Sequence, residues 1–465
     1  MAKSYATPTT GFIDNGGVVQ LGADNAAEQW DYITIPMPSQ PLRIMVEGAL
    51  PTDKDGVSVS VSFFEGAIPL FSASGTWGTQ GQSSATASKK NWKFKLRNAV
   101  TGNKLSVKIG GWPAMTSITC KAYDTDRTLM RDSMTTELWR GMHRFPSGFL
   151  APLSAYQYFD PTDCGVHQEA LFSTAGTPAE IWQNGEFLGV YVIRADNDPP
   201  AYLMDDSNLQ HILIQPQHAG NMWSGNFDST VWDFPSPSVK GYDTGDDMSK
   251  LNTTVNSSTA RLLNWMVACC TGKADFRSTY KQYLDLTSAL DFILITEWSL
   301  SFDSLNNNFM LGSWDATPTS GIWHFWPYDE DETFGIAWFL SASGAIDPTF
   351  GWVTDDASVN KVPGGQPPGI FKVIREQMRP ELRARWRALR DSGAISDDAV
   401  SRFITAYGAK ISPDALAQDL INWPMTGWTG NQQGAIKIAQ SVSYLAQIAH
   451  DRMAWIDAQW GYSSS

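Results

Sequence analysis

From about Trp30 to Phe71 the hydrophobic and polar positions follow the two-residue period of β-strands. The clearest case is Val57–Phe63, where apolar residues alternate with serines, so that one face of a strand is buried and the other is exposed. A small, polar segment, GTWGTQGQSSATASKK, then precedes a second strand pattern, NWKFKLRN, which predicts a loop between two strands. Later, Asn184-Gly185 separates the two apolar runs of EIWQNGEFLGVYVIRA and predicts a β-hairpin.

A helical period dominates the second half of the chain. Earlier, Arg127–Met142 already places Met130, Met134 and Leu138 on one helical face, which we expect to pack on a sheet. The segment Leu286–Ser301 is apolar on most sides, and we expect it to be a core helix. Further helical patterns cover Ala260–Cys270, Phe371–Asp391, Asp397–Gly408 and Gln440–Trp460.

These patterns predict an α+β protein with a β-rich N-terminal part and a helix-rich C-terminal part. We expect a β-rich region over residues 1–110, a mixed α/β region over 111–255 and a helix-rich region over 256–465. Within the middle region, residues 211–247 are rich in Trp, Asp, Gly, Pro and Ser without periodicity. Such a stretch is typical of a long irregular insertion that faces a ligand or a partner.

The amino-acid composition limits the classes of partner that the protein can bind. The sequence has 34 Lys and Arg against 48 Asp and Glu, a net charge of −14, and such a field repels nucleic acid and anionic membranes. No stretch is long and apolar enough for a membrane span, and the N-terminal residues lack the apolar run of a secretion signal. We therefore expect a protein that is made in the cytoplasm without secretion.

Neither the cysteines nor the histidines are spaced as metal ligands. Two of the four cysteines, Cys269 and Cys270, are adjacent on a predicted buried helix, and we expect all four to be reduced. The six histidines show no i, i+4 pairing, which argues against a zinc site.

The candidate chemistry lies on the acidic stretch after the apolar helix. Asp303 is followed five positions later by Asn308, and Asp329 and Asp331 lie further on in PYDEDETFG. This order is close to that of kinase sites, where one Asp orients the acceptor hydroxyl and the other groups bind Mg²⁺ through hard oxygen atoms. The alternative is a solvated acidic turn in which Asn306–Asn308 only caps the helix.

The order of several motifs supports the kinase interpretation. GQSS precedes KKNWKFKL, and YDTDRTLMRDSMTTELWR, IWQNGEFLGVYV, YLDLTSALDFIL, DSLNNNFML and FWPYDEDETFG follow in that order. In this arrangement, from roughly residue 40 to residue 460, the chain resembles the spore coat protein H-like (CotH) kinase family. The resemblance implies an atypical protein-kinase-like fold that transfers phosphate from ATP to protein side chains, with Mg²⁺ or Mn²⁺.

The resemblance also assigns roles in the acidic stretch. It makes Asp303 the candidate catalytic residue and Asn308 a ligand of the metal or the phosphates. Asp331 becomes the metal-binding aspartate, with Asp329 as its close competitor.

In the β-rich region the resemblance implies a phosphate-binding loop at Gly81–Ser84, including Gly81, Ser83 and Ser84, whose small residues let backbone amides approach oxygen anions. Lys90 is the candidate lysine that neutralises phosphate. The neighbouring lysines 89, 93 and 95 are alternatives, and Lys90 could instead be a solvated strand residue.

One position departs from the family pattern. The family has a Glu a few residues after Gly-Val-Tyr, whereas this chain has Ala195. In kinases a Glu holds the phosphate lysine by an ion pair. Asp196 or Asp198 could substitute, but each is displaced. We therefore expect weak or no phosphorylation, as in a pseudokinase, even where Mg-ATP binds.

Two further functions stay open. The acidic composition, the aromatic segment 211–247 and the missing secretion signal favour a non-catalytic structural component of a bacteriophage virion or tail, located in the phage particle and bound to other virion proteins. Exposed tryptophans of the same segment could instead stack on sugar rings and bind a glycan. The enzyme hypothesis requires a protein substrate as partner.

Overall fold

The computed structural model describes two compact units, which are interleaved along the chain. Unit 1 comprises Met1–Asp124, Thr177–Arg194 and Tyr407–Met425, and unit 2 comprises Thr125–Gly176, Ala195–Ala406 and Thr426–Ser465. The described residues are 12–14, 19–21, 31–81, 87–143, 170–217, 222–224, 231–238, 252–337, 346–362, 365–424 and 439–463.

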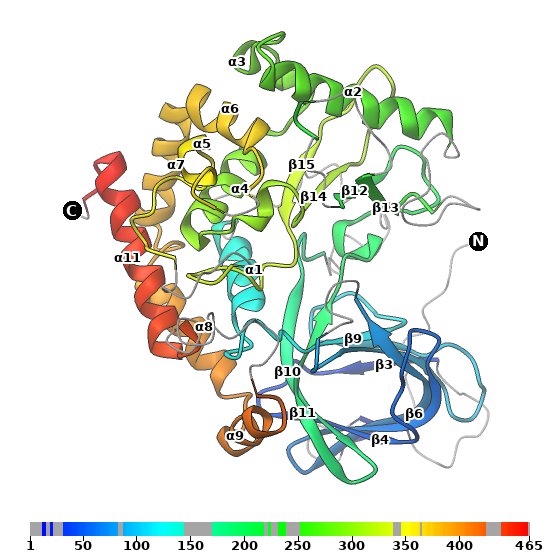
Figure 1. The fold of residues 1–465 in the computed structure, drawn as a ribbon. Helices are drawn as coiled ribbons and strands as arrows, with labels where there is room; N and C mark the ends of the chain where they lie inside the picture. Colours follow the sequence, from blue (N-terminus) through cyan, green and yellow to red (C-terminus); the bar gives the residue numbers. More distant parts are fainter. Residues whose placement is uncertain are drawn as a thin grey trace. The chain divides into compact units, whose positions relative to one another are not determined.

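Unit 1 is built on a closed seven-stranded barrel, drawn mainly in blue with two green strands in Figure 1. In spatial order its strands are β10 (Ala175–Gln183), β11 (Glu186–Ala195), β9 (Ile118–Lys121), β7 (Asn91–Arg97), β6 (Ile68–Gln80), β5 (Val57–Glu65) and β4 (Leu42–Glu47). Two small two-stranded sheets accompany it: β1 (Phe12–Asp14) with β2 (Val19–Leu21), and β3 (Tyr32–Ile35) with β8 (Ser106–Ile109).

The predicted alternation of β5 and β7 is confirmed. Val59, Val61 and Phe63 are buried, and Trp92 and Phe94 of β7 are buried as well. Closing the sheet removes its edges, and the inward residues of each strand fill the interior.

The predicted hairpin at Asn184-Gly185 is also confirmed, because it joins β10 to β11. Asn184 has φ 50° and Gly185 has φ 85°, the two positive values that a tight hairpin turn requires. This hairpin closes the barrel, since β10 pairs in parallel with β4 while β11 pairs antiparallel with β9.

A helix that the pattern analysis missed, α9 (Pro413–Asn422), belongs to unit 1. The Ser412 side chain accepts a hydrogen bond from the Ala415 amide, and Pro413 occupies the first turn. Both features are start signals of a helix. Ser412 and Pro413 could therefore have predicted the start of this helix from the sequence.

Unit 2 contains a four-stranded antiparallel sheet and most of the helices. The sheet order is β13 (Trp232–Ser236), β12 (Ile212–Pro216), β14 (Phe309–Ser313) and β15 (His324–Pro327). The α-helices are α1 (Arg131–Met142), α2 (Thr253–Cys270), α3 (Phe276–Thr279), α4 (Leu286–Ser299), α5 (Asp356–Val359), α6 (Gly369–Gln377), α7 (Arg379–Asp391), α8 (Asp397–Gly408) and α11 (Val442–Trp460).

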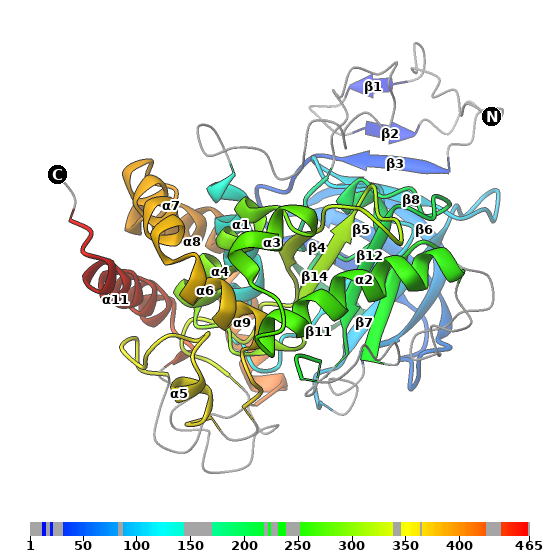
Figure 2. The same cartoon turned by 90° about the horizontal axis from the view of Figure 1, so that it is seen from above.

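Helix α4 lies at the centre of unit 2, as predicted. Every residue from Ser288 to Ser299 is buried, and the helix packs against β15, α1, α6, α7 and α11. Figure 1 shows α4 in the interior of unit 2, and Figure 2 shows α1 and α6 beside it. Because α4 is enclosed, the chain that leaves its C-terminal end is held in a fixed place.

Three predicted helices have different bounds. The helix expected over Ala260–Cys270 begins already at Thr253, where the Asn252 side chain accepts a hydrogen bond from the Thr254 amide. The helix expected over Arg127–Met142 begins only at Arg131, because Leu129 has φ 58° and cannot continue a helical turn. The helix expected over Phe371–Asp391 is two helices, α6 and α7, which meet at Met378. Pro380 favours the break, since it has no amide hydrogen to continue the hydrogen bonds of α6 and is suited to the first turn of a new helix.

The irregular structure expected over 211–247 is contradicted at Ile212–Pro216 and Trp232–Ser236, which are strands, whereas its contact with a ligand or partner stays a prediction. Strands β12 and β13 lie within this segment, because their apolar residues fill a sheet. Its two tryptophans, Trp223 and Trp232, are buried at 4% and 2% exposure, so neither is a platform for sugar stacking. The Trp223 indole donates to the Leu305 carbonyl and packs against Phe371.

The α+β class, with a β-rich N-terminal part and helix-rich C-terminal part, is confirmed. Among the described helices, none is long and apolar enough to cross a bilayer. Cys120 and Cys269 are buried free thiols and Cys270 is a half-buried one, as expected, whereas Cys164 lies outside the described residues.

A buried ion pair joins α11 to α4. Arg452 Nη2 lies 3.0 Å from Glu297 Oε2, and both side chains are fully buried. The Glu297 carboxylate also accepts hydrogen bonds from the Val353 and Thr354 amides at 2.7 and 2.9 Å. Removing one partner of such a pair leaves an uncompensated buried charge.

We therefore expect Arg452→Met to lower the free energy of unfolding by about 3 kcal/mol. Arg402→Met is the matched control, because Arg402 pairs with Asp398 on α8 with 66% and 75% of the two side chains exposed, and exposed pairs contribute little. Chemical denaturation of both variants checks this. Equal losses of stability would contradict the role given to the buried pair.

Candidate functional site

The chain leaving α4 folds Asp303 and Asn308 onto each other. A 3₁₀ turn, η7 (Asp303–Leu305), follows the helix, and the backbone amides of Asn307 and Asn308 donate to the Asp303 carbonyl at 3.1 and 3.2 Å. This turn brings the Asn308 amide nitrogen to 2.7 Å from Asp303 Oδ2.

Sheet register brings the second acidic segment to the same place. Strand β14 pairs with β15 so that Phe309 faces Pro327, which puts Asn308 beside the chain that leaves β15. Asn308 Nδ2 also donates to the Asp329 carbonyl at 2.7 Å. One amide group therefore joins both parts of the motif predicted from sequence.

The side chains of the predicted metal set differ in their contacts. Thr125 Oγ1 lies 3.5 Å from Asp331 Oδ2, and Asn308 Oδ1 accepts from Asn307 at 2.9 Å. Within the described part of the chain, no three His, Cys, Asp or Glu side chains are grouped so that they could hold a metal ion. The donor types present, two aspartates and an amide, fit a hard cation such as Mg²⁺, and their convergence on one ion stays a prediction.

Glu330, between the two aspartates, is a residue that sequence reasoning missed. Its carboxylate accepts from Ser301 and Ser304 at 2.7 and 2.8 Å, and the side chain is buried. Burial raises the pKa of Glu330 to about 8, and the charges of Asp132 and Asp303 add to the rise, whereas the two serine hydroxyls oppose it. The raised pKa favours the protonated form of Glu330 near neutral pH, and the side chain acts as an internal hydrogen-bonding group.

Asp132, near the start of α1, anchors the same loop. Its Oδ1 accepts from the Glu330 amide at 2.8 Å, and its carboxylate also accepts from the Thr174 hydroxyl at 3.3 Å. No local signal separated Asp132 or Glu330 from ordinary acidic residues, because their roles arise from contacts between distant segments.

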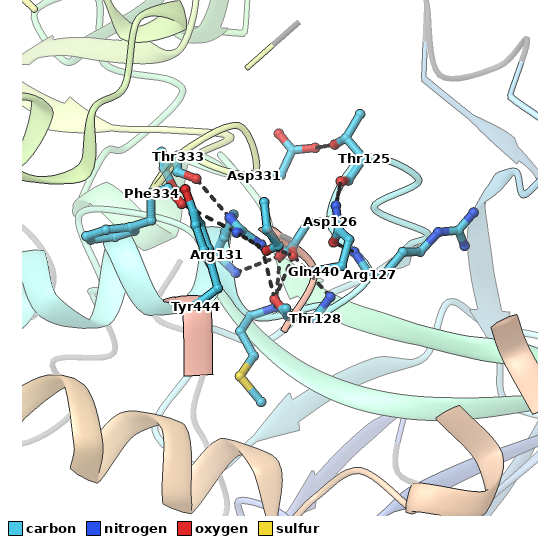
Figure 3. Close-up of polar contacts among 12 residues, drawn as sticks. Thr125, Asp126, Arg127, Thr128, Arg131, Asp331, Thr333, Phe334, Gln440 and Tyr444 are labelled. Atoms are coloured by element: carbon cyan, nitrogen blue, oxygen red, sulfur yellow. Dashed lines mark hydrogen bonds and ion pairs between the residues drawn. The ribbon is translucent and has the colours of Figure 1, made fainter. Parts of the chain in front are cut away.

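Arg131 is the centre of a buried network, shown in Figure 3. Its Nη1 lies 2.6 Å from Asp126 Oδ1, with both side chains fully buried. Its Nε donates to the Thr333 carbonyl at 2.8 Å, and its Nη2 donates to the Ala439 carbonyl at 2.6 Å. Arg131 therefore fixes the segment that follows Asp331 against the start of α1.

Asp126 also holds the backbone at Arg131 in place, at the start of α1. Its Oδ2 accepts from the amides of Met130 and Arg131 at 3.0 and 2.8 Å, which satisfies free amides at the start of α1. Gln440 adds a second connection, accepting from the Arg127 amide at 2.6 Å and donating to the Thr125 carbonyl at 2.9 Å.

The backbone conformation explains why a glycine follows Phe334 at the end of the acidic motif. Phe334 has φ 45° and Gly335 has φ 92°, and an added Cβ at Gly335 would collide with the Tyr444 side chain. Only glycine combines this backbone conformation with so close a neighbour.

In unit 1, Lys90 and Lys89 have different environments. Lys90 is half-buried and lies 3.4 Å from the Ala87 carbonyl. Lys89 is fully buried, and its Nζ lies 2.9 Å from Asp419 Oδ1 and 2.5 Å from the Val190 carbonyl. Lys89 therefore has an acidic partner in Asp419.

Asp419 comes from α9, the helix that was missed. Its Oδ1 also accepts from the Val190 amide at 2.9 Å. A Cβ added at Gly189 would lie 2.5 Å from the same oxygen, so the glycine of Gly-Val-Tyr allows the carboxylate to approach β11. Ala195 itself is buried with 1% exposure.

The predicted phosphate loop is described only at its first residue. Gly81 has φ 110°, whereas Ser83 and Ser84 lie outside the described residues. Their contact with phosphate stays a prediction.

Comparison with known proteins identifies one family. The family described as CotH kinase protein matches residues 78–456. That span contains Gly81 and Lys89 of unit 1 as well as Arg131, Asp303 and Asp331 of unit 2. No curated protein matches the sequence of the chain.

We expect Arg131→Lys to destabilise unit 2 by about 3 kcal/mol, because a lysine cannot hold Asp126 and the carbonyls of Thr333 and Ala439 together. Arg277→Lys is the control, since Arg277 makes a similar set of contacts with Glu381 and Gln377 at an exposed position. Hydrogen exchange of residues 329–335 should accelerate only in Arg131→Lys. Unchanged exchange there would contradict the anchoring role.

Proposed function

The chain belongs to the CotH kinase protein family, and we propose that it binds ATP with Mg²⁺ or Mn²⁺ and transfers the terminal phosphate to a serine or threonine of another protein. The observation that carries the proposal is the Asn308 amide, which lies 2.7 Å from both Asp303 Oδ2 and the Asp329 carbonyl. It supports the kinase interpretation over a solvated turn, since Asn308 is 5% exposed.

The proposed roles follow the chemistry of phosphoryl transfer. Asp303 orients the acceptor hydroxyl and accepts its proton as the hydroxyl oxygen bonds to phosphorus and ADP leaves. Asn308 and Asp331 hold the cation, with Asp329 as the alternative ligand. The bound cation supplies positive charge that neutralises the phosphate oxygens.

A network that fixes these residues suits this reaction, because positioning supplies most of the catalysis in phosphoryl transfer. In its protonated form, Glu330 holds the loop to Ser301 and Ser304 without adding a third negative charge between Asp329 and Asp331.

In unit 1 we assign the phosphate-neutralising role to Lys89, with Lys90 as the alternative, and we place Gly81, Ser83 and Ser84 in the phosphate loop. The expectation of impaired transfer rested on the missing acid at Ala195. Asp419 gives Lys89 a carboxylate partner at 2.9 Å, so the proposal retains the full reaction.

A second candidate is a non-catalytic scaffold, such as a structural component of a phage virion or tail. The complete burial of the Lys89 side chain favours it, because a lysine that already contacts Asp419 and Val190 must be released before it reaches phosphate.

We expect purified protein given radiolabelled ATP with Mg²⁺ or Mn²⁺ to label itself or an added serine- and threonine-containing protein. Asp303→Asn should lower incorporation by about 100-fold or more, since it removes the proton acceptor. Asp315→Asn is the control, because Asp315 is an exposed aspartate just after β14. Equal background labelling by wild type and Asp303→Asn would instead support the scaffold.

We also expect Asp419→Asn to weaken ATP binding and to lower the stability of unit 1 by about 3 kcal/mol, because it leaves the buried Lys89 without its counter-charge. Asp414→Asn, on the same helix but without a contact to Lys89, is the control. Isothermal calorimetry with Mg-ATP separates the two roles. A loss of stability with unchanged affinity for ATP would restrict the pair to a structural role.

A further inference from the structure

Unit 1 contains a cavity that is lined only by its own residues. Its volume is about 350 Å³, within the range of small-ligand sites. Its lining residues come from β6, β7, the β4–β5 connection and the residue after β6, and include Lys54, Asp55, Gly78, Gly81, Lys93 and Lys95.

The period of β7 places two lysines in this cavity. Trp92 and Phe94 are buried, so Lys93 and Lys95 project to the opposite face. They pair with Gly78 and Thr76 of β6, which leaves space beside Lys93 because Gly78 has no side chain.

The same glycine brings the third lysine close. A Cβ at Gly78 would lie 2.9 Å from the Lys54 carbonyl, and the Thr79 amide donates to the Asp53 carbonyl at 2.8 Å. The β4–β5 connection therefore lies directly on β6, and Lys54 lines the cavity from that side.

The charges of the cavity are not balanced. Three lysines face one carboxylate, Asp55, although the whole chain carries −14. Among the described residues, the side chains of Lys54, Lys93 and Lys95 form no ion pair and donate no hydrogen bond. Grouped lysines repel one another, and a bound anion relieves that repulsion.

We propose that this cavity binds a phosphate-type oxyanion that carries at least two negative charges. The same chemistry has two sources, a free anion such as pyrophosphate and a phosphorylated serine in a peptide. The cavity shares Gly81 with the phosphate loop of the proposed function, but its charged groups, Lys54, Lys93 and Lys95, have no role in the proposed kinase reaction. The metal-free titration below therefore tests this anion site separately from the binding of Mg-ATP.

The test is isothermal calorimetry of the full chain with sodium pyrophosphate, at low salt and with a chelator that excludes cation-dependent binding. We expect Lys93→Met combined with Lys95→Met to weaken binding about tenfold or more, since each lysine contributes a charge-assisted contact. Asp55→Asn should tighten binding severalfold, because it removes the opposing carboxylate. Lys104→Met, which removes an exposed lysine of unit 1 outside the cavity, should stay within about twofold of wild type.

A phosphoserine peptide and its unphosphorylated form distinguish the sources. Tighter binding of the phosphoserine peptide than of pyrophosphate supports a protein ligand, and the reverse supports a free anion. The proposal is overturned if neither probe binds the wild type, or if Lys104→Met loses as much affinity as the cavity variant. Thermal unfolding of each variant verifies that the barrel is folded.

Discussion

The buried guanidinium of Arg131 is the interaction on which the acidic site depends. Its charge is compensated by Asp126 at 2.6 Å, and its remaining donors bind the carbonyls of Thr333 and Ala439. Arginine suits this place because its planar group donates in several directions and stays charged when buried. Without it, the connection of the segment after Asp331 to α1 would be reduced to weaker contacts such as that between the Thr135 and Thr333 hydroxyls.

Two more buried ion pairs follow the same principle, each joining segments that are distant in sequence. Glu297 and Arg452 are 155 residues apart, and Lys89 and Asp419 are 330 residues apart. Replacing such pairs by apolar residues is often neutral for stability, so their value lies in the specific arrangement that they impose. Here that arrangement fixes α11 on α4 within unit 2 and α9 on the barrel within unit 1.

Sequence patterns predicted those elements whose form is decided locally. The alternation of Val57–Phe63 and the Asn184-Gly185 turn needed only the strand period and positive φ. The start of α1 was wrong because Asp126 and Leu129 act through side-chain capping and backbone conformation, which a hydrophobic period does not register. Strands β12 and β13 were missed because a four-stranded sheet gives their short apolar runs a partner that no local window contains.

In the candidate site, too, local features could be predicted from the sequence and contacts between distant segments could not. Asp303 and Asn308 could be proposed together because five residues of a tight turn separate them, whereas the roles of Glu330 and Asp132 depend on contacts made across the fold. The ion pair of Lys89 shows why the missing acidic residue at Ala195 is weak support for a loss of function. An acidic residue is missing from β11 at Ala195, yet the carboxylate of Asp419, on helix α9, contacts the same strand at Val190 and pairs with Lys89. An ion pair requires a charge at a distance of a few ångströms and does not require that the charge come from a given place in the chain.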